Sequence, residues 1–180
     1  GEQGAFELTT PSGVVSSSLI VNSAGLFADK VARMGGVTRW RIWPCRGEYL
    51  ILDKAKGDLV NSMVYPVSPK EGAGLGIHIT PTTDGNIILG PSADYTSDGD
   101  DVRTTAKIRR QLLAEAFEFM PGFTARDVIT AYSGMRPKLV PSSVGGFGDF
   151  VVEEVPEALG VMQLVGIESP GLTAAPAIAE

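Results

Sequence analysis

Cysteine and histidine each occur once in this sequence, as Cys45 and His78. A single cysteine excludes an internal disulfide and a cysteine-ligated iron–sulfur cluster within the chain. A single histidine limits metal chemistry further. No nucleophile pattern of the G-x-S-x-G or H-E-x-x-H type is present. Motifs of these common kinds therefore do not locate a catalytic centre.

Long apolar runs and clusters of cations are missing as well. No stretch approaches the roughly 18 apolar residues that a membrane span needs, so membrane association is not indicated. A formal net charge of -6, without a Lys/Arg-rich run, argues against a nucleic-acid partner, because binding to the phosphate backbone depends on clustered cations. The first residues show no secretory signal pattern. We therefore expect a cytoplasmic location.

The remaining composition is that of a folded globular protein. Apolar residues make up 43% and charged residues 20% of the 180 residues, a length that suits one sizeable core. We expect a single domain over residues 1–180. The last residues, AAPAIAE, lie in an expected helix that has no glycine cap or polar exit. We therefore expect the chain to be a piece of a longer protein.

Turn signals divide the sequence into strands. Pro11 and Gly13 punctuate a hairpin within residues 5–22, and Asp84-Gly85 separates two apolar runs at residues 75–80 and 86–90. Apolar and β-branched runs predict five more strands. These cover residues 40–53, 59–67, 127–135, 150–155 and 161–167.

Helical spacing is clearest over residues 104–120, where Ile108, Leu112 and Ala116 repeat along one face and Pro121-Gly122 follows. A shorter helix is expected over residues 26–34, and another from Pro170 onward. Strands and helices do not alternate regularly. The pattern predicts an α+β domain with a mixed, largely antiparallel sheet and flanking helices, of about nine strands and three helices.

Five short motifs carry a resemblance. They are VNSAGLFA at 21–28, RGEY at 46–49, GIHITP with DG and LGP within 76–91, GMRP at 134–137 and GIESPGLT at 166–173. In this order they resemble the FAD-dependent oxidoreductases that include D-amino-acid oxidase, FAD-dependent glycerol-3-phosphate dehydrogenase and 2-hydroxyglutarate oxidase. The resemblance implies the substrate domain of a two-domain flavoprotein, with pieces of the FAD-binding domain at about residues 1–36 and 160–180.

One part of the family pattern is absent. No G-x-G-x-x-G turn follows a strand, although that turn and its helix hold the pyrophosphate of FAD. The resemblance implies that this motif belongs to a missing N-terminal FAD-binding segment, which would be this chain's partner. FAD is accordingly the expected cofactor of the full-length protein, and we do not expect this chain alone to retain it.

The resemblance also assigns cofactor contacts. Small residues let backbone approach a ligand, and a serine cap with proline in the first turn suits the helix start at 169–173. An ordinary capped helix is the alternative. The expected cofactor-binding residues are Ala24, Gly25, Gly47, Gly166, Ser169, Pro170, Gly171, Leu172 and Thr173.

Five further residues are substrate or catalytic candidates. Arg136 would grip a carboxylate or phosphate through its guanidinium fork, with Lys138 adding positive potential on the same side of a strand. His78 would act as general base toward a hydroxyl group. Arg46 and Tyr49 would orient substrate or flavin. The alternatives are a solvated charge for Arg136, a structural hydrogen-bonded His78 and a core position for Tyr49.

The function that the resemblance implies is oxidation of a small anionic hydroxy compound, either glycerol 3-phosphate or a 2-hydroxy acid, with hydride transfer to FAD. The second hypothesis from the residues is a non-catalytic module that binds an anion or another subunit. The presence of the glycine-rich nucleotide motif upstream of Gly1 would separate the two.

Overall fold

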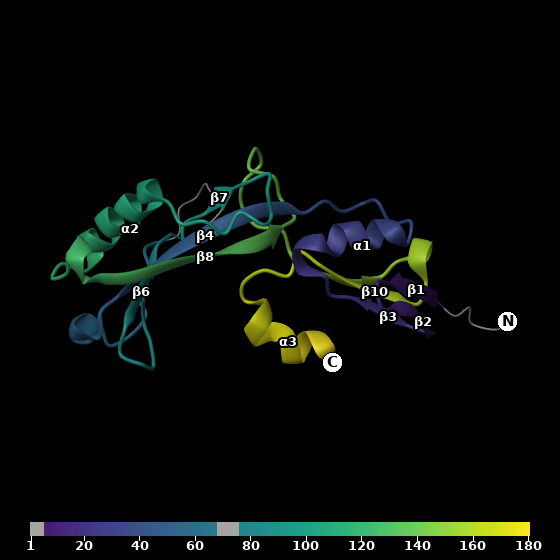
Figure 1. Ribbon diagram of the computed structural model, residues 1–180, viewed down its shortest axis with the longest axis horizontal. Helices are drawn as coiled ribbons and strands as arrows, with labels where there is room; N and C mark the ends of the chain where they lie inside the picture. The colour runs from purple at the N-terminus through teal and green to yellow at the C-terminus, as the bar shows by residue number, and fades with distance from the viewer. Residues whose placement is uncertain (1–5, 68–75) are drawn as a thin grey trace. The chain divides into compact units, whose positions relative to one another are not determined.

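A computed structural model describes residues 6–67 and 76–180, which contain ten strands, three α-helices and four short 3-10 segments (Figure 1). The chain divides into two compact units. Unit 1 comprises residues 1–42, 137–139 and 148–180, and unit 2 comprises 43–136 and 140–147. One domain over residues 1–180 stays a prediction, as do the cofactor-domain pieces at about 1–36 and 160–180. Both of these pieces fall within unit 1.

Unit 2 is built on an antiparallel sheet around β4 (Trp43–Leu52). β4 pairs with β6 (Ile87–Gly90), β7 (Asp94–Tyr95) and β8 (Val128–Lys138), and β5 (His78–Pro81) pairs with β6. β5 and β6 form the hairpin expected around Asp84-Gly85, and Gly85 adopts a φ of 88° that glycine tolerates best. Residue 75 of the expected first strand lies outside the described residues.

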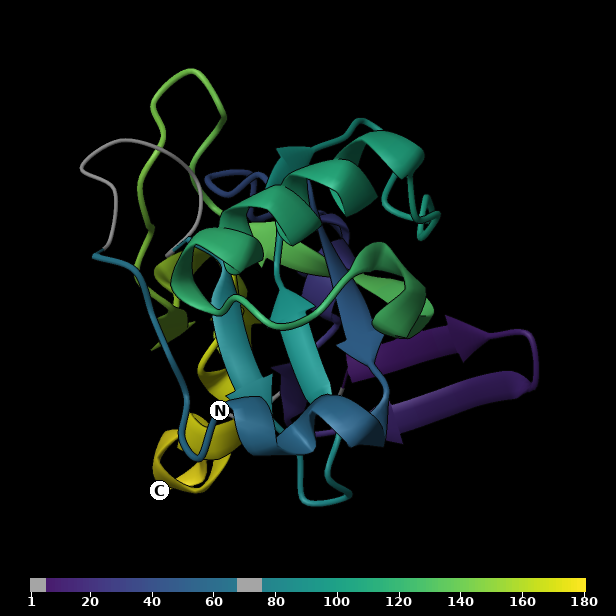
Figure 2. The same ribbon diagram turned by 90° about the vertical axis from the view of Figure 1, so that its left-hand side faces the viewer.

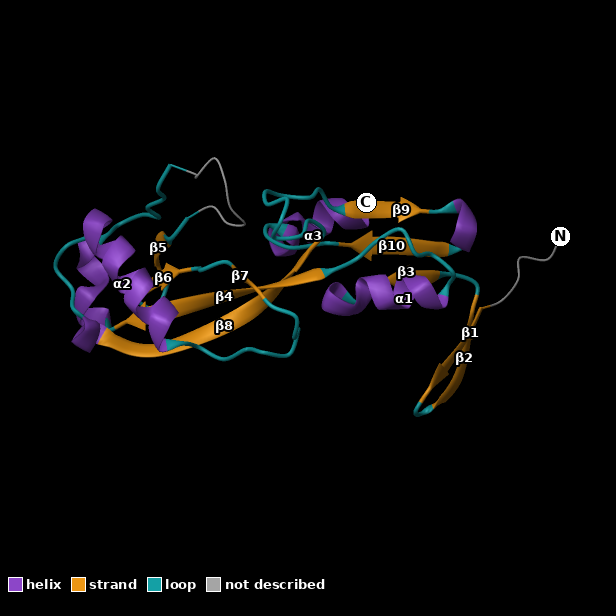
Figure 3. Ribbon diagram, turned by 90° about the horizontal axis from the view of Figure 1, so that it is seen from above, coloured by secondary structure: helices purple, strands orange, loops and turns teal. Residues whose placement is uncertain are grey.

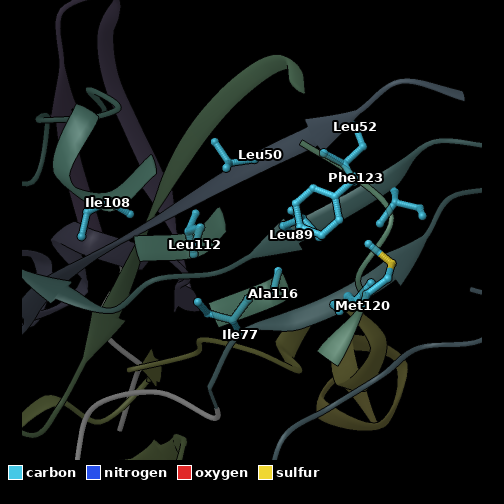
Figure 4. Close-up of a cluster of buried hydrophobic side chains, with 11 residues drawn as sticks. Leu50, Leu52, Ile77, Leu89, Ile108, Leu112, Ala116, Met120 and Phe123 are labelled. Carbon is cyan, nitrogen blue, oxygen red and sulfur yellow. The ribbon is translucent and has the colours of Figure 1, made fainter. Parts of the chain in front are cut away.

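Helix α2 (Ala106–Phe119) covers one face of this sheet (Figure 2). Thr105 caps it by accepting a hydrogen bond from the Ile108 amide at 3.3 Å. Its buried stripe packs on alternate residues of β4, β5 and β6, as Figure 4 shows. The buried cluster consists of Leu50, Leu52, Ile77, Ile79, Ile87, Leu89, Ile108, Leu112, Ala116, Met120 and Phe123. The predicted helix over 104–120 is confirmed.

Unit 1 contains a smaller mixed sheet of β3 (Ile20–Asn22), β10 (Val161–Val165) and β9 (Val151–Glu154), seen in Figure 3. β3 and β10 run parallel, whereas β9 and β10 run antiparallel. α1 (Ala28–Met34) packs on this sheet, and α3 (Gly171–Ala179) follows β10. The expected N-terminal hairpin is present as β1 (Phe6–Thr10) and β2 (Gly13–Ser17). The α+β class with a largely antiparallel sheet is thus confirmed.

One expected strand is wrong. Residues 59–67 do not form a strand; a 3-10 segment, Lys54–Leu59, ends at the start of this range, and only an isolated bridge joins Val64 to Ile79. Met63, Tyr65 and Val67 are exposed, so the apolar run is not the buried face of a sheet. The other 3-10 segments are Gly25–Phe27, Ala125–Asp127 and Pro156–Ala158.

No helix within residues 6–67 and 76–180 is both long enough and apolar enough to cross a membrane.

Candidate functional site

The face of the unit 2 sheet opposite α2 carries the predicted catalytic residues. Successive side chains of a strand point to opposite faces, so the buried Leu50 and Ile79 place Tyr49 and His78 on the other side. His78 pairs with Gly90 in the ladder. The pairing of Leu50 with Leu89 puts Gly90 beside Tyr49. His78 and Tyr49 therefore lie on one face, with a glycine between them.

Arg136 reaches the same face from β8. A Cβ built on Gly47 would lie 2.5 Å from Arg136 Nη2, so the guanidinium occupies the space that a side chain at position 47 would take. Nη2 donates a hydrogen bond to the Ser92 carbonyl at 3.1 Å, and Nη1 lies 3.9 Å from Cys45 Sγ. Gly47, predicted to bind the cofactor, is the position over which this arginine lies.

His78 has the electrostatics of a proton acceptor. Burial, together with the positive charge of Arg136, lowers the pKa of His78 from its ordinary value of 6.5, so the imidazole is neutral at neutral pH. Nε2 is buried and has no hydrogen-bond partner among the residues that the structure describes. The ring of Tyr65 packs edge-on against the imidazole with centroids 4.5 Å apart. A neutral imidazole beside a guanidinium suits removal of a proton from an anionic substrate.

An aromatic pair borders this group. Tyr49 stacks on Tyr132 of β8 with ring centroids 4.8 Å apart and planes at 6°. Tyr132 is 42% exposed, and burial, followed by the neighbouring Tyr49, raises the pKa of its phenol. Tyr49 is therefore not a core residue of the α2 cluster. Tyr132 was not among the sequence candidates; its spacing of four from Arg136 on β8, which extends beyond the predicted strand at 127–135, places both side chains on one face.

Arg46 does not join this group. It alternates with Gly47 and faces α2, where its Nη1 binds Asp101 Oδ2 at 2.6 Å and its Nη2 lies 3.4 Å from Glu48 Oε1. Glu48 in turn accepts hydrogen bonds from the amide and hydroxyl groups of Thr105 at 2.6 and 3.1 Å. This network fixes the N-terminus of α2 to β4. A structural role is the simpler account of Arg46.

Two of the predicted cofactor motifs meet in unit 1. Because β3 and β10 are parallel, the segments that follow their carboxyl ends lie at the same edge of the sheet, where α/β folds bind nucleotides. Gly25 and Gly171 line one cavity of about 750 Å³, together with Ser23 and Ile167. The rest of its lining is mainly apolar: Val21, Val152, Met162, Leu164, Ala175, Ile178, Ala179 and Glu180.

A buried amide pair supports this edge. Asn22 Nδ2 donates to Gln163 Oε1 and to the Ala28 carbonyl, both at 2.8 Å, and so closes the turn between β3 and α1. Ala24 packs against the buried cluster of Ala28, Ile42 and Val165. The predicted contact of Ala24 with the cofactor stays a prediction.

The start of α3 differs from the expectation in one respect. Pro170, not Ser169, is the N-cap residue, and no side chain caps the helix. The Ser169 cap is therefore wrong, because Ser169 lies one residue too early. Leu172 is 91% exposed, and Thr173 Oγ1 donates to the Pro170 carbonyl at 2.9 Å. No side chain caps this first turn; the Gly171 amide donates to the Glu168 carbonyl at 2.6 Å, and the helix start carries partial positive charge.

Lys138 is placed differently from Arg136. It is 1% exposed, and its Nζ lies 3.0 Å from Oε1 of Glu168 in the loop between β10 and α3. Gly166 begins this loop with a φ of 73°, and Leu139 packs so closely on it that a Cβ would lie 2.5 Å from Leu139 Cδ1. Lys138 therefore serves the loop, and its charge is balanced by Glu168.

The residues present fit a flavin better than a metal. No group of three or more metal-ligating side chains occurs in the part of the chain that the structure describes. The glycines and the helix start without a side-chain cap at the edge of the unit 1 sheet instead suit close approach by a flat ring with polar edges. Together with a histidine and an arginine on the sheet face opposite α2, these features are those of a flavoprotein oxidoreductase.

Comparison with known proteins supports the same class of flavoprotein oxidoreductase. A family model described as FAD-dependent oxidoreductase matches residues 1–180, and the chain belongs to this family. It is 33% identical to a glycerol 3-phosphate dehydrogenase of Caloramator mitchellensis over 96% of this chain and 34% of that protein. It is 36% identical to a mitochondrial L-2-hydroxyglutarate dehydrogenase of Arabidopsis thaliana over 91% of this chain and 36% of that protein. The chain thus spans about a third of these relatives' length.

Solved structures show the same fold. An L-alpha-glycerophosphate oxidase of Mycoplasma pneumoniae with FAD bound superposes with a TM-score of 0.79 at 29% identity, covering 95% of this chain and 42% of that chain. A glycine oxidase of Bacillus cereus superposes with a TM-score of 0.75 at 17% identity, covering 96% and 43%. The expected family and its cofactor, FAD, are confirmed.

Proposed function

We propose that the full-length protein oxidises a small anionic hydroxy compound, glycerol 3-phosphate or a 2-hydroxy acid, with FAD as electron acceptor. In this proposal, unit 2 binds the substrate, and the missing N-terminal segment supplies most of the FAD site. The observation that carries it is the grouping of neutral His78 with Arg136 on the sheet face opposite α2. The names of the relatives, which act on CH–OH compounds, supply the substrate class.

The side chains divide the chemistry between them. Arg136 binds the phosphate or carboxylate group, because a guanidinium matches two oxygens of such an anion. His78 takes the proton of the hydroxyl group while the carbinol carbon loses a hydride, so that CH–OH becomes C=O. Burial, followed by the neighbouring positive charge of Arg136, lowers the pKa of His78 and keeps the base unprotonated. The stacked Tyr49 and Tyr132 give the substrate an apolar wall.

FAD, when bound, supplies the acceptor for that hydride. Residues around Gly25 and at 166–173 would hold it, since Gly25, Ile167 and Gly171 from the two motifs line one cavity, the rest of which is mainly apolar. The start of α3, whose partial positive charge no side chain caps, would face an electron-rich edge of the ring.

The test uses the full-length protein with FAD bound, under anaerobic conditions. Glycerol 3-phosphate and 2-hydroxyglutarate are added separately, and loss of the yellow flavin absorbance is followed; glycerol is the uncharged control. Bleaching by one of the two anions but not by glycerol is expected. Bound FAD that no anionic hydroxy compound reduces would contradict the proposal and favour a non-catalytic anion-binding module.

A further inference from the structure

Tyr65 is an aromatic residue beside His78 that the chemistry above does not use. It lies in the irregular segment at 59–67, and 52% of its surface is exposed. Its ring meets the imidazole edge-on, with 4.5 Å between the ring centroids. A half-exposed tyrosine outside the sheet adds little to the buried core. Its contact with the proposed base therefore calls for a separate account.

Backbone pairing sets Tyr65 opposite His78. Val64 and Ile79 exchange two hydrogen bonds, at 2.9 and 3.0 Å, and both side chains pack in the cluster beneath α2. Because this bridge is antiparallel, Tyr65 and His78 are the next two residues to face each other. Alternation along the chain turns both side chains to the sheet face opposite α2. The ring contact is thus fixed by the register of the backbone.

The residues on both sides of Tyr65 hold it in place. The Tyr65 hydroxyl group donates a hydrogen bond to Met63 Sδ at 3.1 Å. Pro66 packs on Gly76, where an added Cβ would lie 2.5 Å from Pro66 Cγ. Gly76 has a φ of 87°, which glycine adopts without strain. These contacts keep the tyrosine ring against the imidazole.

His78 has different neighbours on its two sides. β5 is the edge strand of its sheet, and Tyr65 covers its outer side. On the inner side the paired residue is Gly90, which has no side chain. The last torsion of a histidine side chain has broad minima, and the buried Nε2 has no hydrogen-bond partner among the described residues. Packing by Tyr65 therefore takes the place of the hydrogen-bonded group that commonly orients a catalytic base.

We propose that Tyr65 is a positioning residue that keeps the imidazole of His78 turned toward Arg136 and the substrate. This inference rests on the proposed function. Without the ring of Tyr65, the imidazole is free to turn outward over the edge of the sheet into water. The base is then within reach of the substrate hydroxyl group for a smaller fraction of the time, whereas Arg136 still binds the anion. The loss therefore falls on kcat and not on KM.

Two variants of the full-length holoprotein separate the ring of Tyr65 from its hydroxyl group. Tyr65→Ala should lower kcat about tenfold to a hundredfold with KM little changed, because a misplacement of about 1 Å can cost about a hundredfold in rate. Tyr65→Phe keeps the ring and should retain nearly the full kcat. Val67→Ala changes a residue of the same segment that is 97% exposed, and this control should match the unaltered protein. Unaltered kcat in Tyr65→Ala, or equal losses in Tyr65→Phe and Tyr65→Ala, would overturn the proposal.

The pH profile of kcat/KM gives a second readout. Burial, followed by the charge of Arg136, lowers the pKa of His78. Loss of the Tyr65 ring removes part of that burial, so the pKa rises toward 6.5. Activity needs the unprotonated base and should therefore begin to fall at a higher pH in Tyr65→Ala. The other titratable groups on this face, Tyr49 of β4 and Tyr132 and Arg136 of β8, are unchanged, and β6 places only Gly90 beside His78. An inflection at the same pH would also overturn the proposal.

A double variant tests whether Tyr65 acts through His78. His78→Ala removes the base, so adding Tyr65→Ala to it should lower kcat no further. A further loss as large as that of Tyr65→Ala alone would assign Tyr65 a purely structural role and refute the inference. If Tyr65→Ala folds poorly, Tyr65→Thr replaces it, because a β-branched residue suits an extended segment and also lacks the ring.

The two levels of the hypothesis fail in different ways. If neither glycerol 3-phosphate nor 2-hydroxyglutarate reduces the flavin of the unaltered full-length protein, the proposed function fails. If the unaltered protein is reduced and Tyr65→Ala is reduced at the same rate, only the role of Tyr65 fails.

Discussion

Gly47→Ala in the full-length protein should impair substrate oxidation without unfolding the sheet. The new methyl carbon would lie 2.5 Å from Arg136 Nη2 and 3.0 Å from Cζ. Ordinary contacts begin near 3.4 Å, so the guanidinium must move by roughly 1 Å, and a misplacement of that size can cost about a hundredfold in rate. Gly47 has no positive φ, so an alanine there meets no backbone strain, and the three atoms nearest to its Cβ all belong to Arg136.

The moved guanidinium would also lose its hydrogen bond to the Ser92 carbonyl. A hydrogen bond to a charged group contributes about 1.5 to 3 kcal/mol, which corresponds to roughly tenfold to a hundredfold. We therefore expect kcat/KM for the anionic substrate to fall by about that factor, with the melting temperature little changed because the obstructed atoms are the far end of a flexible side chain.

Gly134→Ala is the matched control. Gly134 lies two residues before Arg136 on β8, and a Cβ there meets no atom within 4 Å. Steady-state kinetics of the two variants should differ clearly, with Gly134→Ala near the unaltered protein. Equal kcat/KM values for both variants would refute the view that Gly47 exists to seat Arg136.

Three further predictions concern the same residues and the chain as a whole. Arg136→Lys should lower kcat/KM because charge is kept but the fork is lost, and Arg136→Ala should lower it more, by about 2 to 5 kcal/mol; near-normal kinetics for Arg136→Ala would move the anion clamp elsewhere. His78→Ala should lower kcat by about 10²- to 10⁴-fold. Since burial and Arg136 depress the pKa of His78, activity should fall only below pH 6.5, and Arg136→Ala should move that inflection to higher pH; an unmoved inflection would argue against His78 as the base. The isolated 180-residue chain should purify colourless, and flavin that survives gel filtration would show that it holds FAD by itself.

The elements that follow local rules could be predicted from the sequence. The hairpin at Asp84-Gly85 and helix α2 have turn and spacing signals that agree with their burial. The run at 59–67 misled because it is an irregular segment in which Val60 and Val64 pack on the core while Met63, Tyr65 and Val67 are exposed, and periodicity cannot tell such a segment from a strand.

The site could be predicted only in part. The motifs located His78, Arg136 and the loop at 166–173, because each carries a distinctive chemistry or turn. Arg46 was placed with them by its motif, yet strand alternation turns it toward α2, where Asp101 and Glu48 balance its charge. The burial of Lys138 could not be foreseen, since its partner Glu168 is 30 residues away in sequence.

Neither Gly47 nor Gly90 places a side chain on the sheet face opposite α2, and the reason differs between the two positions. At Gly90, φ is 133° and a Cβ would lie 2.8 Å from the Glu48 carbonyl oxygen, which belongs to the backbone and cannot step aside. At Gly47 the obstacle is the mobile end of Arg136. Evolution or engineering toward a substrate without an anionic group can therefore exchange Gly47 and Arg136 together, whereas Gly90 constrains the fold whatever the substrate. New substrate specificity should therefore come from joint substitutions of Gly47 and Arg136 and not from substitution of Gly90.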